Sequence, residues 1–384
     1  MMRYVGIDVG KARCRAALMN QKGAIESEFF FENNTRGISN LVSVLTGKDQ
    51  VVMEFTGNLW LNIYDALDHK NIRVVLANPM KTKAIASARV KTDKVDARIL
   101  AHLLRADLVA ASYVPPVNLR EMRALVRHRL SLVKMRTMVK NKVHAVTDKC
   151  GCRCEYSDMF GKAGMEWLRT LEMGELDRLV LENHLSHIES INAQISRVDE
   201  AIRKRASQDE DVRLLLSMTG IDVYTALLIR SEVGPISRFS DYKKLVSWTG
   251  LAPRVYQSGN VEYGGAITKR GSSVLRWAMI EAARVAVQHD EKLGAFYQRV
   301  RERRGDQKAT VATANKMLKI IWVMLTRHET YGNANEKRYW KKLKKGLALN
   351  GRCWLQERNG SLVEELASFM RENVLLTFIA EELS

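Results

Sequence analysis

The sequence contains few of the features that would place the chain in a membrane or in a disulfide-bonded class. None of its apolar runs approaches the roughly 20 residues needed to cross a bilayer. The N-terminal stretch Met-Met-Arg-Tyr-Val-Gly-Ile-Asp lacks the layout of a secretory signal peptide. Only five cysteines occur among 384 residues, and their placement does not suggest a secreted disulfide framework. We therefore expect a cytoplasmic protein with no membrane partner.

Cysteine and histidine spacing also gives little support for a zinc site. Cys150, Cys152 and Cys154 fall within five residues, but no matching Cys/His pair follows at zinc-finger spacing. His144 and Cys353 are conceivable fourth ligands. We do not include zinc among the expected cofactors.

Acidic residues are scarce relative to basic ones. The chain has 61 Lys and Arg against 43 Asp and Glu, a formal net charge of +18. Such an excess favours a polyanionic partner, most commonly a phosphate backbone. A hydrophobic content of 46% and a length of 384 residues also predict folded cores in two or three domains.

Residues 1–112 predict alternating strands and helices. Strands are expected at 3–8, 13–18, 24–31, 51–55 and 74–77, and helices near 37–45, 59–69 and from 79 onward. Three strands, helix, strand, helix, strand, helix is the order of an RNase H-like domain. Its mixed sheet can gather carboxylates at the ends of its strands.

Four acidic residues in this segment suggest a metal site. Asp8 and Glu54 each end a short apolar run, and Asp93 and Asp96 lie close together farther on. An unpaired carboxylate near a buried strand is costly, and a divalent metal would remove that cost. Carboxylates holding two Mg²⁺ ions form a site for phosphodiester chemistry. We predict that these four residues are catalytic metal ligands.

Each acid also has an ordinary interpretation. Asp93 could cap a helix, with Asp96 favoured in its first turn, and Glu54 could cap the helix that follows it. The Gly-Ile-Asp-Val-Gly around Asp8 also opens the actin-like sugar kinases and ATPases. Those proteins need a second Gly-rich phosphate turn and an adenosine-binding glycine cluster, and the sequence has neither.

Residues 113–209 predict an extended helical linker. Arg120 to Lys142 includes eight basic residues and one acidic residue. Apolar residues from Leu181 to Ile202 recur every three or four positions, as in a coiled coil or helical hairpin. We interpret the linker as a dimerisation arm, with a packed spacer as the alternative. The expected nucleic-acid contacts here are Arg123, Arg127, Lys134, Lys140 and Lys142.

Residues 210–331 predict a mainly helical domain. A Gly-containing turn near Gly220 resembles a helix-hairpin-helix, whose backbone N–H groups can meet a phosphate. A hairpin at 255–268 and long helices at 273–289 and 310–326 follow. Residues 332–384 form a basic extension, where Tyr339 and Trp340 suggest either a nucleotide contact or a solvated charged helix.

Ser258 is a candidate nucleophile beside a basic cluster. Ser-Gly turns are usually inert, and the nearest histidine in sequence is His289, so an activating base or metal must come from elsewhere. A phosphate could sit at the start of the helix at 273, although an N-cap at Ser272 or Ser273 explains the same residues. The expected nucleic-acid contacts in this region are Arg254, Tyr256, Lys269 and Arg270.

These motifs together resemble the insertion-sequence one-ten family of DEDD transposases, which includes the pilin-gene invertases. The N-terminal half is similar to their RuvC-like domain through Gly6-Ile7-Asp8, Glu54-Phe55-Thr56-Gly57 and the run from Lys91 to Arg98. The second half is similar to their transposase domain through Gly220-Ile221, Gly250-Leu251-Ala252-Pro253, Tyr256-Gln257-Ser258-Gly259 and Ile267-Thr268-Lys269-Arg270-Gly271. The match covers about residues 3–331 in the same order.

The resemblance implies a mechanism and partners. It implies Asp8, Glu54, Asp93 and Asp96 as Mg²⁺ ligands and Ser258 as a nucleophile that forms a phosphoserine link to DNA. It also implies a homodimer or homotetramer in which different protomers supply the carboxylates and the serine. Many members are guided by a structured bridge RNA that pairs with target and donor DNA.

Three alternatives remain open on the sequence. One is a site-specific invertase without a guide RNA, and another is a junction-resolving nuclease that uses a metal-activated water. The third is a non-catalytic nucleic-acid-binding protein, which the net charge supports but the buried acids do not.

Overall fold

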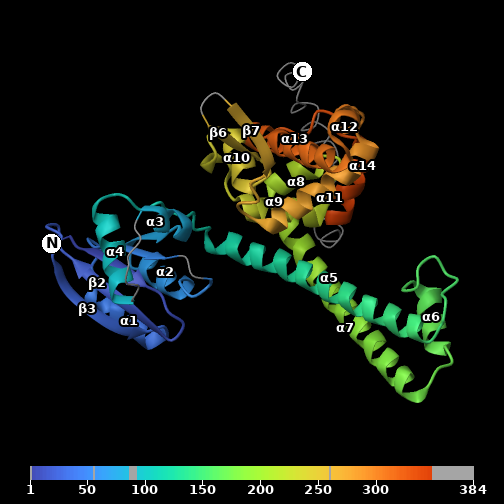
Figure 1. Cartoon of the computed structure of the whole chain (residues 1–384), viewed down its shortest axis with the longest axis horizontal. Coiled ribbons are helices and arrows are strands. Elements are labelled where there is room, and N and C mark those ends of the chain that lie inside the picture. Colours follow the sequence, from blue (N-terminus) through green and yellow to red (C-terminus); the bar gives the residue numbers. More distant parts are fainter. Residues whose placement is uncertain (1, 55–56, 86–92, 259–260, 348–384) are drawn as a thin grey trace, which may run out of the picture. The chain divides into compact units, whose positions relative to one another are not determined.

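The computed structural model describes residues 2–54, 57–85, 93–258 and 261–347, and the chain divides into two compact units at Pro115 and Pro116 (Figure 1). Proline fixes its own backbone and lacks an N–H group, so a Pro-Pro pair does not continue a helix or a sheet. The boundary falls close to the expected end of the first domain at residue 112. The further division at residues 209 and 331 stays a prediction.

The first unit contains a five-stranded mixed sheet, as the sequence predicts. Its strands are β1 (Tyr4–Asp8), β2 (Arg13–Met19), β3 (Ile25–Glu32), β4 (Gln50–Glu54) and β5 (Arg73–Ala77). They lie in the order β3-β2-β1-β4-β5. The pairs β1–β2 and β2–β3 are antiparallel, whereas β1–β4 and β4–β5 are parallel. Phe55, which the sequence assigns to the fourth strand, lies outside the described residues.

Helices cover both faces of this sheet. Successive side chains of a strand point to opposite faces, so neighbouring residues pack against different helices. Val5 and Ile7 of β1 are buried in one core with residues of α1 (Thr35–Val44) and α2 (Leu61–Asp68). Val52 of β4 is buried with Leu100 and Leu104 of α4 (Asp93–Arg105), so α4 lies on the opposite face. Helix α3 (Pro79–Ile85) begins at Pro79, where proline is well tolerated.

Gly6 lets α4 lie directly on the central strand. A Cβ atom at this position would lie 2.0 Å from the Ala97 carbonyl oxygen and 2.7 Å from the Ala101 amide nitrogen. Ala97 and Ala101 are themselves fully buried. The close approach of helix backbone to strand backbone therefore requires glycine on the strand and alanine on the helix.

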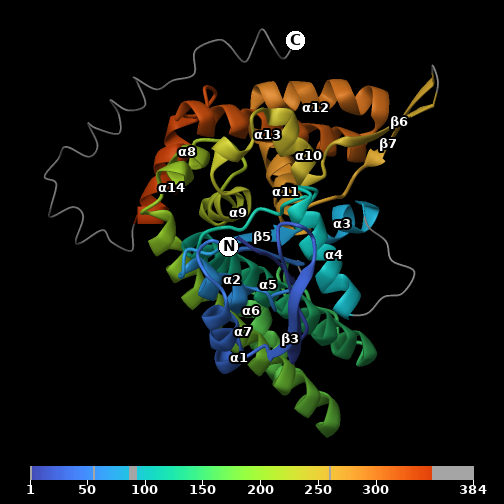
Figure 2. The same ribbon diagram turned by 90° about the vertical axis from the view of Figure 1, so that its left-hand side faces the viewer.

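The second unit begins with two long helices joined near one end by a shorter one (Figures 1 and 2). They are α5 (Val117–Lys149), α6 (Lys162–Thr170) and α7 (Glu175–Ala206). Leu181, Leu185, Ile188, Ile195 and Ile202 are buried along α7, which packs against α5. The apolar residues spaced three and four positions apart on α7 thus form its contact with α5 within one chain.

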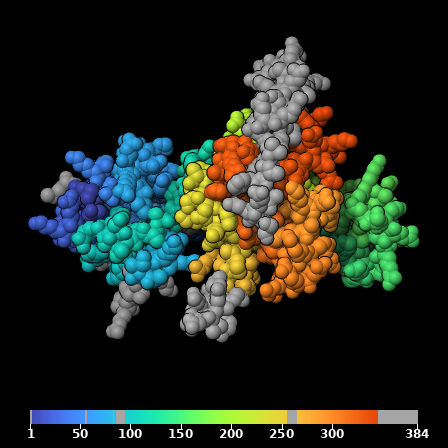
Figure 3. Space-filling view, turned by 90° about the horizontal axis from the view of Figure 1, so that it is seen from above, coloured from blue at the N-terminus to red at the C-terminus, as the bar shows by residue number. Residues whose placement is uncertain are grey.

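The rest of the second unit is mainly helical and, in its described residues, contains the expected β-hairpin. It contains α8 (Glu210–Leu216), α9 (Val223–Val233), the 3-10 turn η1 (Ile236–Arg238), α10 (Tyr242–Thr249), β6 (Pro253–Ser258), β7 (Val261–Ile267), α11 (Ser273–His289), α12 (Glu291–Arg304), α13 (Asp306–Arg327) and α14 (Glu336–Leu347). Helix α13 packs against α10, α11 and α12, and Figure 3 shows the yellow and orange surfaces of these segments in contact. Among the described helices, none combines the length and apolar character that a bilayer-spanning segment needs.

Helix α14 confirms a charged helix in the basic extension and corrects the expected exposure of Tyr339. Tyr339 is 1% exposed and belongs to the main core of the unit, where Leu343 accompanies it one turn later. Trp340 packs against the same core. A nucleotide contact through Tyr339 is therefore wrong, because the surrounding lysines hide a narrow apolar stripe at positions i and i+4.

A buried carboxylate joins α5 to α9. Glu232 is 2% exposed and accepts two hydrogen bonds from the Arg127 guanidinium, at 2.7 and 3.0 Å. The Arg123 guanidinium donates to the carbonyl oxygens of Ser231 and Glu232 at 2.9 and 3.2 Å. These bonds neutralise a charge that would otherwise be buried alone at the end of α9.

Replacing Gly6 with alanine should destabilise the first unit. The added methyl group has to push α4 away from β1, and overpacking of this kind costs about 1–3 kcal/mol. Thermal unfolding of the full chain, with hydrogen exchange in β1 and α4, measures the effect. Gly47→Ala is the control, because its Cβ would have no neighbour closer than 4.0 Å. Equal stability of the two variants would contradict the packing argument.

Replacing Glu232 with alanine should destabilise the second unit by about 2–3 kcal/mol. The loss lies below the range of about 3–5 kcal/mol for broken buried pairs, because the Arg127 side chain is 48% exposed and water can solvate part of its charge. Chemical denaturation measures the change. Glu189→Ala removes the exposed ion pair with Arg169 and should have little effect. A similar loss in both variants would show that Glu232 has no special role.

Candidate active site

Two of the four predicted acids end neighbouring parallel strands. Ile7 of β1 pairs with Met53 of β4, so the next residues, Asp8 and Glu54, stand side by side at the carboxyl ends of these strands. Both residues are half-buried. The sheet thus brings together two carboxylates that lie 46 positions apart in the sequence.

The other two acids start the helix that covers the same face. Val5, Ile7, Val51 and Met53 point to the core beneath α1 and α2, so the alternating residues Asp8 and Glu54 face the α4 side. Asp93 and Asp96 occupy the first turn of α4, and α4 packs on both β1 and β4. The structure therefore gathers all four backbone positions at one edge and one face. Their catalytic role stays a prediction.

The chemistry of this donor set suits a hard divalent cation, because carboxylate oxygens are the ligands that Mg²⁺ prefers. Asp8, Glu54 and Asp96 have described side chains, whereas the side chain of Asp93 lies outside the described residues. Within the described side chains, no group of three His, Cys, Asp or Glu residues is close enough to hold a metal ion. The residue types and their placement therefore fit such a cation, but the described carboxylates do not form a complete set of metal ligands.

A thiol near Asp8, in the core on the opposite face of the sheet, contributes no charge of its own. Cys14 is 1% exposed, and burial, together with the nearby negative charge of Asp8, raises its pKa to about 11. The thiol is therefore protonated at neutral pH and is not a nucleophile or a thiolate ligand. The chemistry available at this edge comes from the carboxylates.

An ion-pair network fixes α4 to the outer strands. Glu28 of β3 pairs with Arg98 of α4 and also accepts from Arg15 of β2 at 3.3 Å. The Glu28 side chain is only 12% exposed. Arg98 lies two residues after Asp96, so the network helps to position the acidic turn. The sequence gives no signal for Glu28, because its partner on α4 lies 70 residues away.

Ser258, the candidate nucleophile, belongs to the second unit. It is the last residue of β6, and its backbone pairs with Val261 at the start of β7. The side chains of Ser258 and Tyr256, and all of Gly259, lie outside the described residues. The expected hairpin is present, whereas the roles of Ser258 and Tyr256 stay predictions.

The basic loop after the hairpin has a rigid backbone. Gly250 and Gly271 both have positive φ, and a Cβ on either would lie within 2.0 Å of a carbonyl oxygen across the contact. The Arg276 guanidinium donates to three carbonyls of the two segments, those of Thr249, Arg270 and Gly271. Arg276 was not singled out in the sequence, since one arginine on a helix carries no pattern.

Three of the expected nucleic-acid contacts are exposed around this loop. Lys269 and Arg270 are exposed on it, and Arg254 is exposed on β6, with its guanidinium 3.5 Å from the Thr268 carbonyl. Their side chains are available to an anionic partner. Contact with nucleic acid stays a prediction.

The start of α11 borders a cavity of about 400 Å³. Ser272 is the N-cap, and its hydroxyl accepts from the Leu275 amide at 3.2 Å. Arg127 and Lys134 of α5 line the same cavity. The N-cap interpretation is thus confirmed, and a phosphate at this helix start stays a prediction.

The basic residues expected to bind nucleic acid along α5 have different surroundings. Arg123 and Arg127 have the structural partners already described at the end of α9. The Lys140 ammonium lies 4.3 Å from the centre of the Phe160 ring, in a cation–π contact. Lys134 and Lys142 are exposed. The two lysines are therefore the better placed of the five to meet a phosphate backbone.

Cys150, Cys152 and Cys154 are all free thiols. Cys353 lies outside the described residues.

Two transposase family models match the chain in succession. The DEDD transposase model of the IS110 family matches residues 5–151, which include the four acids. The model described as transposase IS116/IS110/IS902 family matches residues 212–298, which include Ser258 and the basic loop.

Individual relatives extend these matches. The chain is 29% identical over 303 residues to the transposase for insertion sequence element IS1111A of Coxiella burnetii, covering 77% of this chain and 82% of that protein. It is 24% identical over 353 residues to the pilin gene-inverting protein of Moraxella bovis, covering 85% and 97%. The order of both models and the extent of these similarities confirm the resemblance drawn from the motifs, and the chain belongs to the IS110 family of transposases.

Proposed function

We propose that the chain is a Mg²⁺-dependent DNA recombinase that moves an insertion sequence through a phosphoserine intermediate. The observation that carries the proposal is the placement of Asp8 and Glu54 at the ends of neighbouring parallel strands, on the face where α4 begins with Asp93 and Asp96. The strand order β3-β2-β1-β4-β5, with helices on both faces, supports an RNase H-like, RuvC-like assignment for the first unit. A DEDD domain indicates a divalent metal.

In the proposed reaction, the Ser258 hydroxyl attacks a backbone phosphorus atom. A bond forms between the serine oxygen and phosphorus while the bond from phosphorus to one sugar oxygen breaks. The proton that leaves the serine is finally taken up by the departing sugar oxygen. A second sugar hydroxyl later attacks the phosphoserine and releases Ser258, so the number of phosphate ester bonds is conserved and no external energy source is needed.

The acidic residues serve this step by electrostatics. Two Mg²⁺ ions held by Asp8, Glu54, Asp93 and Asp96 would neutralise the negative charge that develops on the phosphate oxygens. The ion pair between Glu28 and Arg98 keeps the first turn of α4 in place beside the strand ends. The exposed Lys269 and Arg270 attract and orient the DNA backbone near the serine.

The proposed partners are donor DNA, target DNA and a structured guide RNA. The net charge of +18 supports a large polyanionic assembly. The guide RNA rests on the family resemblance, and a site-specific invertase without RNA is the alternative. The pilin gene-inverting relative is the similarity that favours this alternative. Sequencing the RNA that copurifies with the protein separates the two.

We also propose a homodimer or homotetramer. Leu176, Leu179 and Val180 are 76%, 55% and 42% exposed near the start of α7, and an apolar group of this kind favours contact with a second copy. Mixing Asp8→Asn protomers with Ser258→Ala protomers tests whether one chain supplies the acids and another the serine. Recovery of activity in the mixture would support shared sites, and its absence would contradict them.

The second candidate function is a junction-resolving nuclease that activates water with the same carboxylates. The acidic edge of the first unit favours it equally, because that edge does not depend on Ser258. The two functions differ in one product, a covalent protein–DNA adduct that survives denaturation.

Replacing Ser258 with alanine should abolish the covalent adduct and strand exchange. Nucleic-acid affinity should remain, because a hydroxyl contributes little to binding a charged backbone. Denaturing gels with labelled element ends measure the adduct. Ser190→Ala on the exposed surface of α7 is the matched control and should retain it. Strand exchange by the Ser258 variant at the wild-type rate would overturn the nucleophile assignment.

Replacing Asp8 or Asp96 with asparagine should lower cleavage on the order of 100-fold or more, because each variant removes one metal-binding charge. Chelation of divalent ions should have the same effect, and added Mg²⁺ should restore cleavage. Asp68→Asn, at the exposed end of α2, is the control that keeps full activity. Unchanged cleavage after chelation would exclude the proposed role of the acids.

A further inference from the structure

The turn between α8 and α9 is held rigidly against α11. Gly220 has φ of +86°, and a Cβ there would lie 2.2 Å from the Ala282 carbonyl oxygen. Glycine is therefore required at this position. Asp222 then caps α9 by accepting a hydrogen bond from the Thr225 amide at 2.8 Å.

Two backbone donors of this turn have no acceptor among the described residues. Within the described part of the chain, the N–H groups of Thr219 and Gly220 donate to no protein acceptor, whereas the next amide, that of Ile221, donates to Met218. Consecutive backbone donors in a turn form a recognised type of anion site.

Helix α14 is fixed beside the turn. The Tyr339 hydroxyl donates to the Arg213 carbonyl at 3.3 Å. The Lys342 ammonium donates to the carbonyls of Leu216 and Met218 at 2.9 and 2.7 Å. Burial lowers the pKa of Lys342 to about 8, which is a sign of how closely it is enclosed. The basic residues of α14 are thus held next to the turn.

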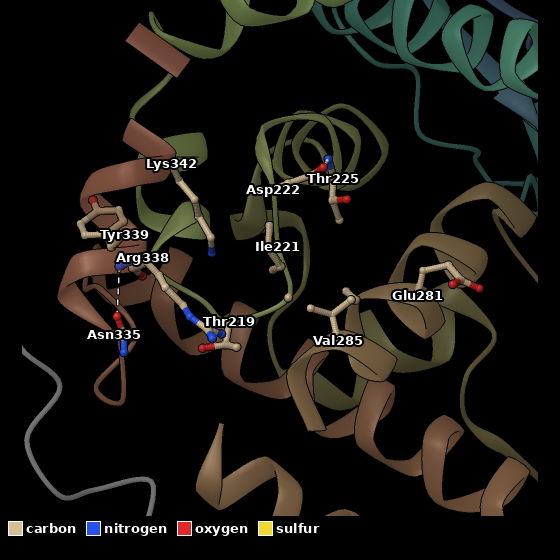
Figure 4. Close-up of a pocket in the computed structure, with 13 residues that line it drawn as sticks. Thr219, Ile221, Asp222, Thr225, Glu281, Val285, Asn335, Arg338, Tyr339 and Lys342 are labelled. Atoms are coloured by element: carbon tan, nitrogen blue, oxygen red, sulfur yellow. Dashed lines mark hydrogen bonds between the residues drawn. The ribbon is translucent and has the colours of Figure 1, made fainter. Parts of the chain in front are cut away.

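Two cavities, of about 400 and 380 Å³, lie beside α14 and share Asp222, Arg338 and Lys342. We call the connected hollow the α14 groove. Figure 4 shows Arg338 and Lys342 reaching from α14 toward the turn that carries Thr219, with Val285 of α11 on the other side. The groove residues used below are Thr219, Gly220, Arg203, Arg338, Lys341 and Lys342.

The carboxylates of the groove already have partners in the protein. Asp199 is 2.6 Å from the Arg129 guanidinium, and Glu281 is 2.8 Å from that of Arg284. Asp222 is the N-cap of α9. These contacts leave the acids of the groove little capacity to neutralise its basic residues.

Three cations of the groove have no such partner. Within the described residues, the side chains of Arg203, Arg338 and Lys341 form no ion pair. Arg338 and Lys341 are exposed, and Arg203 is half-buried. The groove therefore combines unpaired positive charge with backbone donors that have no acceptor.

We propose that the α14 groove binds the phosphate backbone of the DNA substrate. The proposal rests on the proposed function, because a transposase must hold DNA outside its reacting centre. The Thr219 and Gly220 amides donate to one phosphate, and Arg338 and Lys341 provide the neutralising charge. Such contacts fix the position of the duplex without reading its sequence.

The test measures binding of a short DNA duplex of arbitrary sequence to the full chain at several salt concentrations. Arg338→Gln and Lys341→Gln should each weaken binding about three- to tenfold and lower the slope of log affinity against log salt by about 1. Both side chains are exposed and unpaired, so thermal unfolding should not change. Arg304→Gln, at an exposed position on α12, is the matched control with unchanged affinity and slope.

Several outcomes would overturn the proposal. They are unchanged affinity in both groove variants, equal weakening by Arg304→Gln, or no DNA binding by the wild-type chain. A structured RNA of equal length is measured in parallel, and weakening confined to RNA would overturn the assignment to DNA. Failure of the proposed function looks different. In that case the wild-type chain binds DNA and forms no Ser258 adduct, while the groove variants still bind more weakly.

Discussion

The contact of α4 with the bare backbone of Gly6 is the constraint on which the acidic edge depends. Without a side chain at Gly6, the Ala97 carbonyl rests against the strand, and the helix begins beside the strand ends. Asp8 lies two residues after Gly6 and therefore on the same face. The distance between helix and sheet thus decides whether acids from separate elements can act on one phosphate. The network of Glu28, Arg98 and Arg15 supports this distance from the side.

Much of the first unit could be predicted because each strand is a short apolar run bounded by polar or turn residues. The expected strand at 3–8 corresponds to Tyr4–Asp8, and that at 13–18 to Arg13–Met19. The four acids could be selected because they end such runs or stand next to one another. The order of strands and helices indicated that the strand ends would lie together, whereas the register that pairs Ile7 with Met53 across 46 residues could not be derived from the sequence.

The charge of a residue was a poorer guide to its contacts than apolar spacing was to burial. Arg123 and Arg127 belong to a basic stretch, yet both bind the end of α9. Tyr339 lies among lysines, yet it is part of a core. Composition counts charges without showing where each side chain points. Only partners from distant segments, such as Glu232, decide whether an arginine holds the protein together or is available to a ligand.

The burial of Tyr339 and Leu343 has a consequence for the extent of the second unit. The family match ends at residue 298, inside α12, whereas the same core continues through Met317 and Ile321 to Leu343. The span that the family model describes is thus shorter than the span that closes the interior. A shortened version excised for biophysical work would have to retain the chain through residue 347, since a cut at the end of the family model would leave the hydrophobic centre open to water.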